Sequence, residues 1–101
     1  MQELVEDIGE WSEITFGVGD RTKPLLKHLK KEVDEAIVTH DIKSIYFDWA
    51  LADCFILLFD IMYRNNMTMD QIESVIKEKM DVNKKRKWHN PDENGIIEHV
   101  K

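Results

Sequence analysis

The chain of 101 residues contains one cysteine, two prolines and four glycines, and it shows no β-like alternation of polar and apolar residues. With Cys54 as the only thiol, no intramolecular disulfide can form, so a reducing, cytoplasmic location is expected. The N-terminal segment MQELVEDIGE is acidic and lacks the apolar region of a signal peptide. Repeats and low-complexity tracts are also absent, and the length predicts one domain, residues 1–101.

Positive charge is scarce too. The sequence has 14 basic residues against 20 acidic ones, a formal net charge of −6. A protein that binds duplex nucleic acid normally carries a basic surface, so nucleic acid is not an expected partner. An acidic chain instead suits a protein that collects cations.

The longest apolar run, Ile45–Tyr63, is apolar on nearly every side of a helix, which predicts a helix buried among others. It nevertheless carries Asp48, Asp53 and Asp60. Three acids would be costly in lipid, so the run is not expected to span a membrane, and no membrane partner is expected.

The three acids of this run do not share one face. Asp53 and Asp60 lie about 20° apart around a helix, whereas Asp48 points well away from both. Because a carboxylate in apolar surroundings needs a cation, a donor or water, we hypothesise that Asp53 faces a metal ion. The alternative is that the acids line the wetter side of a bundle helix.

Two helices are predicted before this run. The first is expected to run from about residue 3 to about residue 14. The second is expected to begin near Pro24, because proline is tolerated in the first turn of a helix, and to end near Thr39. Between them, Phe16–Lys23 contains two glycines and predicts a loop. In the first helix, Leu4, Ile8 and Trp11 follow helical spacing, which Thr15 would continue at its end. The second helix has a main apolar stripe of Leu26, Leu29, Val33 and Ile37.

A fourth helix is predicted to end at about Arg86, and the tail of about 88–101, with Pro91 and Gly95, is expected to be mostly irregular. Asp41 or Ser44 can cap the start of the third helix, and Asn65 and Asn66 are expected to end it. Thr68 and Gln71 have the spacing of a capping box, which predicts the start of the fourth helix. Four helices with short connections predict an all-α four-helix bundle. The third helix is too apolar for so small a bundle to cover, so we expect a homodimer, in which two third helices meet, or a homotetramer. A compact monomer is the alternative.

Glu32 and Glu35, in the segment HLKKEVDEA, have E-x-x-E spacing. This spacing places two carboxylates on neighbouring positions of a helix, from which both can reach one divalent ion. Such pairs are also common on solvated surfaces. Glu35 points nearly opposite the main stripe, while Glu32 lies at the edge of a second stripe through Leu25, Leu29 and Ala36.

The fourth helix places cations in line with apolar residues. Ile72 and Ile76 begin a stripe that Lys79, Asn83 and Arg86 continue within an arc of about 60°. Two cations and an amide suit the oxygens of a polyphosphate, and arginine can bind two oxygens at once. A solvated helix end, with basic residues near the negative end of the helix dipole, is the alternative.

Four segments in this order resemble the MazG-like all-α nucleoside triphosphate pyrophosphohydrolases. They are W-x4-FG at Trp11–Gly17, HLKKEVDE at His28–Glu35, the apolar helix with Asp53, and K-x3-N-x2-R-x-W at Lys79–Trp88. With the closing EHV at Glu98–Val100, the chain is most similar to the dATP/dGTP diphosphohydrolase N-terminal type.

The resemblance implies an enzyme that cleaves between the α and β phosphates of a (deoxy)purine nucleoside triphosphate such as dATP or dGTP, releasing the monophosphate and pyrophosphate. It implies Mg²⁺, with Mn²⁺ as a possible substitute, held by Glu32, Glu35 and Asp53. It assigns phosphate binding to Lys79, Asn83 and Arg86. Water would be the nucleophile, and Trp11, Phe16 and Trp88 are candidates to pack on the base or ribose.

One position departs from the family. Its second motif, E-x-x-D, requires glutamate where this sequence has Ala50, and Asp48 is directed about 160° away from that position. Either the chain uses fewer protein ligands and more waters, or it is a weakened relative, or a glutamate was replaced to stop turnover. Two other functions follow as alternatives: a catalytically silent nucleotide-binding regulatory module, and a structural helical oligomerisation domain.

Overall fold

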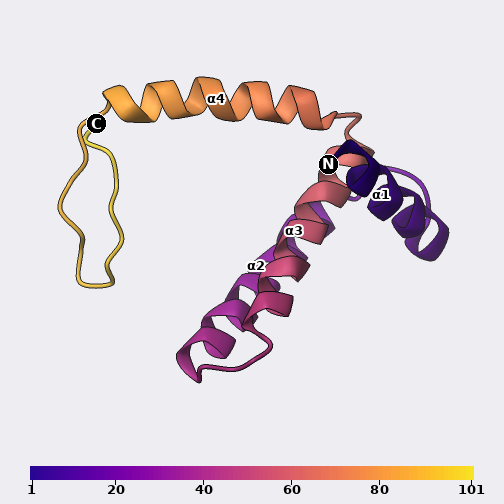
Figure 1. The fold of residues 1–101 in the computed structure, drawn as a ribbon, viewed down its shortest axis with the longest axis horizontal. Helices are drawn as coiled ribbons and strands as arrows, with labels where there is room; N and C mark the ends of the chain where they lie inside the picture. Colours follow the sequence, from indigo (N-terminus) through magenta and orange to yellow (C-terminus); the bar gives the residue numbers. More distant parts are fainter. The chain divides into compact units, whose positions relative to one another are not determined.

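A computed structural model describes all 101 residues as four helices with no β-strand, in agreement with the predicted all-α class (Figure 1). The helices are α1 (Gln2–Phe16), α2 (Thr22–Asp41), α3 (Phe47–Arg64) and α4 (Met69–Lys85). They are divided between two compact units, Met1–Met69 and Asp70–Lys101. None of the helices is both long and apolar enough to cross a membrane.

In the first unit, α2 and α3 lie side by side and run in opposite directions, and α1 packs against α3 (Figure 1). The predicted cap of α3 is wrong, because Asp41 is the last residue of α2 and Tyr46 is the N-cap residue of α3. Ser44 lies before the N-cap residue, and its hydroxyl accepts a hydrogen bond from the Tyr46 N–H at 3.0 Å. This bond organises the turn between α2 and α3.

The buried face of α1 differs from the predicted one. Val5, Gly9 and Ser12 are buried, whereas Leu4 and Trp11 are half exposed, so the inward face lies about one residue further around the helix. Gly9 explains the difference, since a Cβ atom there would lie 2.0 Å from the Tyr63 ring. Only a glycine lets α1 approach α3 this closely, and the larger apolar residues are displaced to the side.

The buried face of α2 is the second apolar stripe. Leu25 and Ala36 are buried, whereas Leu26, Val33 and Ile37 of the main predicted stripe are 45%, 44% and 54% exposed. The prediction that the main stripe faces the core is therefore wrong for the single chain. Because Glu32 adjoins the stripe that does face inward, its side chain is only 23% exposed.

Helix α3 forms the centre of this unit and ends at Arg64, as Asn65 and Asn66 predicted. Asn65 is the C-cap residue, and Asn66 has a φ of 57°, a left-handed conformation that asparagine tolerates. Several apolar side chains of α3 are uncovered in the single chain, among them Trp49 at 73% and Phe55 at 56% exposure.

The second unit consists of α4 from Asp70 onward and a tail that folds back on itself. No residue of α4 is buried. In the tail, predicted to be mostly irregular, Trp88 and His99 form an isolated antiparallel bridge, flanked by a 2.7 Å hydrogen bond from the Val100 N–H to the Lys87 carbonyl. The Asp92 carboxylate accepts hydrogen bonds from two backbone amides at the turn, and this closes the loop.

Candidate active site

A pocket of about 610 Å³ lies among α1, α2 and α3 of the first unit. All three helices contribute side chains to it, together with Arg21, the N-cap residue of α2. The lining residues are Asp7, Ile8, Trp11, Phe16, Arg21, Leu25, His28, Glu32, Asp53, Ile56, Leu57 and Asp60. The wall is therefore largely apolar, with carboxylates from each of the three helices.

Glu32 from α2 and Asp53 from α3 line the same pocket. Both raise the pKa of the Cys54 thiol by their negative charge, in addition to the larger effect of burial on that thiol. The two candidate ligands are thus neighbours in space although twenty residues separate them in sequence. The predicted third ligand, Glu35, is exposed and does not line the pocket.

The donor set fits a hard divalent ion in part. Mg²⁺ is typically bound through one or two carboxylates, with substrate phosphates and waters completing the octahedron, and Glu32 with Asp53 supplies that many. No group of three or more His, Cys, Asp or Glu side chains is arranged to hold an ion by itself. A site built here therefore needs phosphate or water oxygens as well.

His28 precedes Glu32 by one turn of α2, and its Nε2 lies 3.1 Å from Glu32 Oε1. This contact limits where the Glu32 carboxylate can point. Carboxylates that bind metal ions are commonly held by hydrogen bonds from neighbouring groups, and His28 can supply one to Glu32. His28 was not among the predicted site residues, although its i, i+4 spacing with Glu32 is visible in the sequence.

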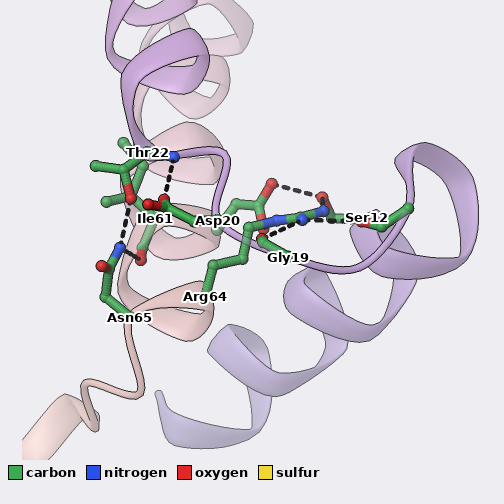
Figure 2. Close-up of polar contacts among 9 residues, drawn as sticks. Ser12, Gly19, Asp20, Thr22, Ile61, Arg64 and Asn65 are labelled. Carbon is green, nitrogen blue, oxygen red and sulfur yellow. Dashed lines mark hydrogen bonds and ion pairs between the residues drawn. The ribbon is translucent and has the colours of Figure 1, made fainter.

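At the opposite end of the pocket, Asp60 is neutralised by a neighbouring arginine. Arg64 Nε donates to Asp60 Oδ1 at 2.9 Å, and the Ser12 hydroxyl donates to Asp60 Oδ2 at 2.5 Å. Arg64 also donates to the Ser12 oxygen at 2.7 Å (Figure 2). The three side chains therefore form one buried network that joins α1 to α3. With its charge paired, Asp60 is a structural carboxylate, in contrast to Asp53.

The same arginine fixes the loop between α1 and α2. One Arg64 nitrogen donates to the carbonyls of Gly17 and Gly19 at 2.9 and 3.0 Å. Asp20 then accepts a 2.9 Å hydrogen bond from the Thr22 N–H, an interaction that lowers the pKa of that carboxyl (Figure 2). The loop is therefore held from both sides where it enters α2.

This loop places aromatic and cationic groups on the pocket wall. Trp11 and Phe16 meet edge to face with ring centroids 5.4 Å apart. The Arg21 guanidinium lies 5.3 Å from the centroid of the Phe16 ring. Phe16 belongs to α1, although the sequence predicted a loop residue, and its position at the last turn brings its ring beside Arg21.

The predicted phosphate-binding residues lie in the second unit. Lys79 and Asn83 are one turn apart on α4, and an Arg86 nitrogen lies 3.5 Å from Asn83 Oδ1. The Trp88 indole N–H donates to the Asn83 carbonyl at 3.0 Å, so this tryptophan is fixed against the end of α4. Asn83 and Arg86 are half buried, whereas Lys79 is exposed.

Position 50 lies on the buried side of α3. Ala50 is 4% exposed and comes seven residues before the buried Leu57, on nearly the same face of the helix. Ala50 does not line the pocket, which Asp53 does. A longer acidic side chain at this position would have to leave the apolar interface to reach an ion.

The comparisons with known proteins concern the sequence and the fold of nearly the whole chain. The sequence profile of the dATP/dGTP pyrophosphohydrolase family matches residues 4–101. The fold is similar to that of the cyanophage S-2L MazG-like pyrophosphohydrolase, solved bound to dGDP and three catalytic Mn²⁺ ions per active site. The TM-score is 0.76 at 23% identity, and the match covers 98% of this chain and 95% of that chain. No curated protein matches.

Proposed function

Because the chain belongs to the dATP/dGTP pyrophosphohydrolase family, we propose that it converts a purine deoxynucleoside triphosphate, dATP or dGTP, to the monophosphate and pyrophosphate. Family membership gives the enzyme class, nucleoside triphosphate pyrophosphohydrolase. The observation that carries the proposal is the shared pocket of Glu32 and Asp53, two carboxylates from different helices beside an aromatic wall. Such a pocket offers an ion end and a base end to one nucleotide.

Glu32 and Asp53 are the proposed ligands of Mg²⁺ or Mn²⁺, with Glu35 joining them through a change of side-chain rotamer. The cyanophage protein binds three catalytic Mn²⁺ ions per active site together with dGDP, which supports the use of a divalent ion. When bound, the ion would offset the negative charge of the phosphates. It would also lower the pKa of a bound water molecule, so that hydroxide could attack. The 3.1 Å contact with His28 orients the Glu32 carboxylate.

Lys79, Asn83 and Arg86 are the proposed binders of the phosphate tail. Their donors would stabilise the charge that accumulates on pyrophosphate as it leaves. An Arg86 nitrogen lies 3.5 Å from Asn83 Oδ1, and the Trp88 N–H donates to the Asn83 carbonyl, so these two contacts orient Asn83. In the first unit, Trp11 and Phe16 are proposed to pack on the base or ribose, and Trp88 is proposed to do so from the second.

A homodimer or homotetramer is proposed as the functional assembly. The support is the uncovered apolar surface of α2 and α3, where Val33, Ile37 and Phe55 line a second groove of about 460 Å³. Monomeric soluble proteins rarely leave so many neighbouring apolar side chains in water. The acidic net charge of −6 supports a protein that does not use nucleic acid as a partner.

The proposal is tested by incubating the protein with a panel of ribo- and deoxyribonucleoside triphosphates, with and without Mg²⁺ or Mn²⁺, and measuring released pyrophosphate. Replacing Asp53 with asparagine should lower the rate of metal-dependent pyrophosphate release by at least about a hundredfold. A loss of this size is typical when one group that stabilises charge in the transition state is removed. The matched control is Asp48→Asn, the same change on α3 at an exposed position outside the pocket. Equal rates in the two variants would contradict the assignment.

A second candidate function is a nucleotide-binding module without turnover. The observation that favours it is Ala50, a buried alanine at the position of the family glutamate. This candidate predicts that nucleotide with Mg²⁺ raises the melting temperature by mass action while no pyrophosphate forms. A purely structural oligomerisation domain predicts no such rise.

A further inference from the structure

Arg21 is the one cation on the wall of the acidic pocket. The other charged side chains on this wall are the carboxylates of Asp7, Glu32, Asp53 and Asp60. His28 also lines the pocket, and it lies between Arg21 and Glu32 along α2. No carboxylate lies within ion-pair distance of the Arg21 guanidinium, although Asp60 is paired with Arg64. Arg21 is half buried and packs over Phe16, so its planar fork is held in place with its donors unused by other charges.

The position of Arg21 along the pocket separates it from the ion end. Arg21, Leu25, His28 and Glu32 follow one face of α2 at intervals of three or four residues. Eleven residues of helix correspond to an axial distance of about 16 Å. A phosphate bound through an ion at Glu32 and Asp53 is therefore at the far end of the pocket from Arg21. The aromatic pair Trp11 and Phe16 lies at the Arg21 end instead.

Together these placements point to the base of the nucleotide as the partner of Arg21. We propose that the Arg21 guanidinium donates to the O6 and N7 acceptors of a purine and thereby selects guanine over adenine. This inference rests on the proposed function and adds the base preference to it. An arginine fork matches two parallel acceptors, whereas adenine presents an amino donor in place of O6 and opposes it.

The loop that carries Arg21 is held by hydrogen bonds from α3 and from its own residues. The Gly17 and Gly19 carbonyls accept hydrogen bonds from Arg64, and the Thr22 N–H is held by Asp20. The Asn65 amide also donates to the Thr22 hydroxyl at 2.8 Å. A donor fork on a fixed loop loses little conformational freedom on binding, which favours discrimination between bases.

The test is the affinity of the full chain for dGTP and for dATP, measured by calorimetry with Ca²⁺ in place of Mg²⁺ to suppress turnover. The wild-type chain should bind dGTP at least about tenfold more tightly than dATP, the discrimination expected of one bidentate contact. Arg21→Ala should lose this preference mainly by weakening dGTP. Arg21→Gln should favour dATP, because a glutamine amide pairs with N6 and N7 of adenine.

Two controls separate the fork from charge and from folding. Arg21→Lys keeps the positive charge without the fork, so it should lose the base preference as Arg21→Ala does. Lys23→Ala removes a cation from an exposed position outside the pocket and should leave both affinities unchanged. Melting curves of every variant in the absence of nucleotide verify that each one is folded.

Three results would overturn the inference. Equal losses for dGTP and dATP in Arg21→Ala would make Arg21 a holder of phosphate or ribose. Unchanged affinities would remove Arg21 from the site, while the proposed function would stand. A wild-type chain that binds neither nucleotide would refute the proposed function itself and the base preference with it.

Discussion

Arg64 and Asp60, one turn apart on α3, form an ion pair of 2.9 Å in which the two side chains are only 2% and 6% exposed. The remaining donors of Arg64 reach Ser12 on α1 and two carbonyls of the loop before α2. A single guanidinium on α3 thus holds α1 and the loop that follows α1. No buried side-chain nitrogen or oxygen is left without a partner.

Breaking this pair should strongly destabilise the protein. Arg64→Met leaves the Asp60 carboxylate buried without its cation, which should lower the free energy of unfolding by about 3–5 kcal/mol in urea denaturation. The double variant Asp60→Leu with Arg64→Met should recover part of that loss, because no charge remains unpaired. Lys77→Ala is the control, since its 3.1 Å pair with Glu73 is mostly exposed and worth about 1 kcal/mol at most. Similar losses for the buried and exposed pairs would contradict this account.

Gly9 should be required for the contact between α1 and α3. In an open helix, alanine would stabilise by about 1 kcal/mol relative to glycine. Here its Cβ would lie 2.0 Å from the Tyr63 ring, so Gly9→Ala should instead destabilise by about 1–3 kcal/mol, measured by denaturant unfolding. Adding Tyr63→Leu should restore much of the loss by removing the ring atoms. An increase in stability from Gly9→Ala alone would show that the helices are not so close.

Ala50→Glu should make stability and activity more dependent on divalent ions. Because Ala50 is 4% exposed, the new carboxylate should lower the melting temperature without metal, and Mg²⁺ should restore it. Pyrophosphate release should rise by at least about tenfold, since even groups that only orient a metal ligand contribute that much. The control, Ala52→Glu, adds the same charge at an exposed position of α3. Unchanged release in Ala50→Glu would remove position 50 from the mechanism.

Asp20 should contribute to stability in a pH-dependent way. The Thr22 N–H lowers the pKa of Asp20 below its ordinary value of 3.8, so the ionised carboxylate favours the folded state. That contribution is present above the unfolded pKa and is lost as the pH falls through the folded pKa. Asp20→Ala should therefore lower the melting temperature slightly at neutral pH, with a smaller difference at about pH 2. Asp34→Asn, at an exposed site on α2, serves as the comparison; a pH-independent effect of Asp20→Ala would refute the role of its charge.

The elements themselves were largely predictable because helix signals are local. Asn65 and Asn66 ended α3 as predicted, and helical spacing found all four helices within a few residues. The faces were less predictable. In α1, the spacing of apolar residues predicted that Leu4 and Trp11 face the core. Small residues such as Gly9 decided the packing instead, because they allow the backbones of α1 and α3 to approach each other.

The same holds for the candidate site. Asp53 and Asp60 were placed on one face by their spacing, and both line the pocket. Spacing could not show that Asp60 is structural while Asp53 is a candidate metal ligand. That difference depends on Arg64, which pairs with Asp60 and is itself held by hydrogen bonds to α1 and to the loop before α2. Arg21 gave no sequence signal at all, because its significance comes from Phe16 and from the acidic wall around it.

The sequence by itself determined the all-α class, the order of the helices and the acid-bearing α3, since periodicity, caps and breakers act over a few residues. Tertiary packing decided which stripe of α2 turned inward, and with it whether Glu32 met Asp53 in one pocket. The physical reason is that helical geometry fixes angles within a helix, while the rotation of each helix against its neighbour depends on side-chain fit across the interface.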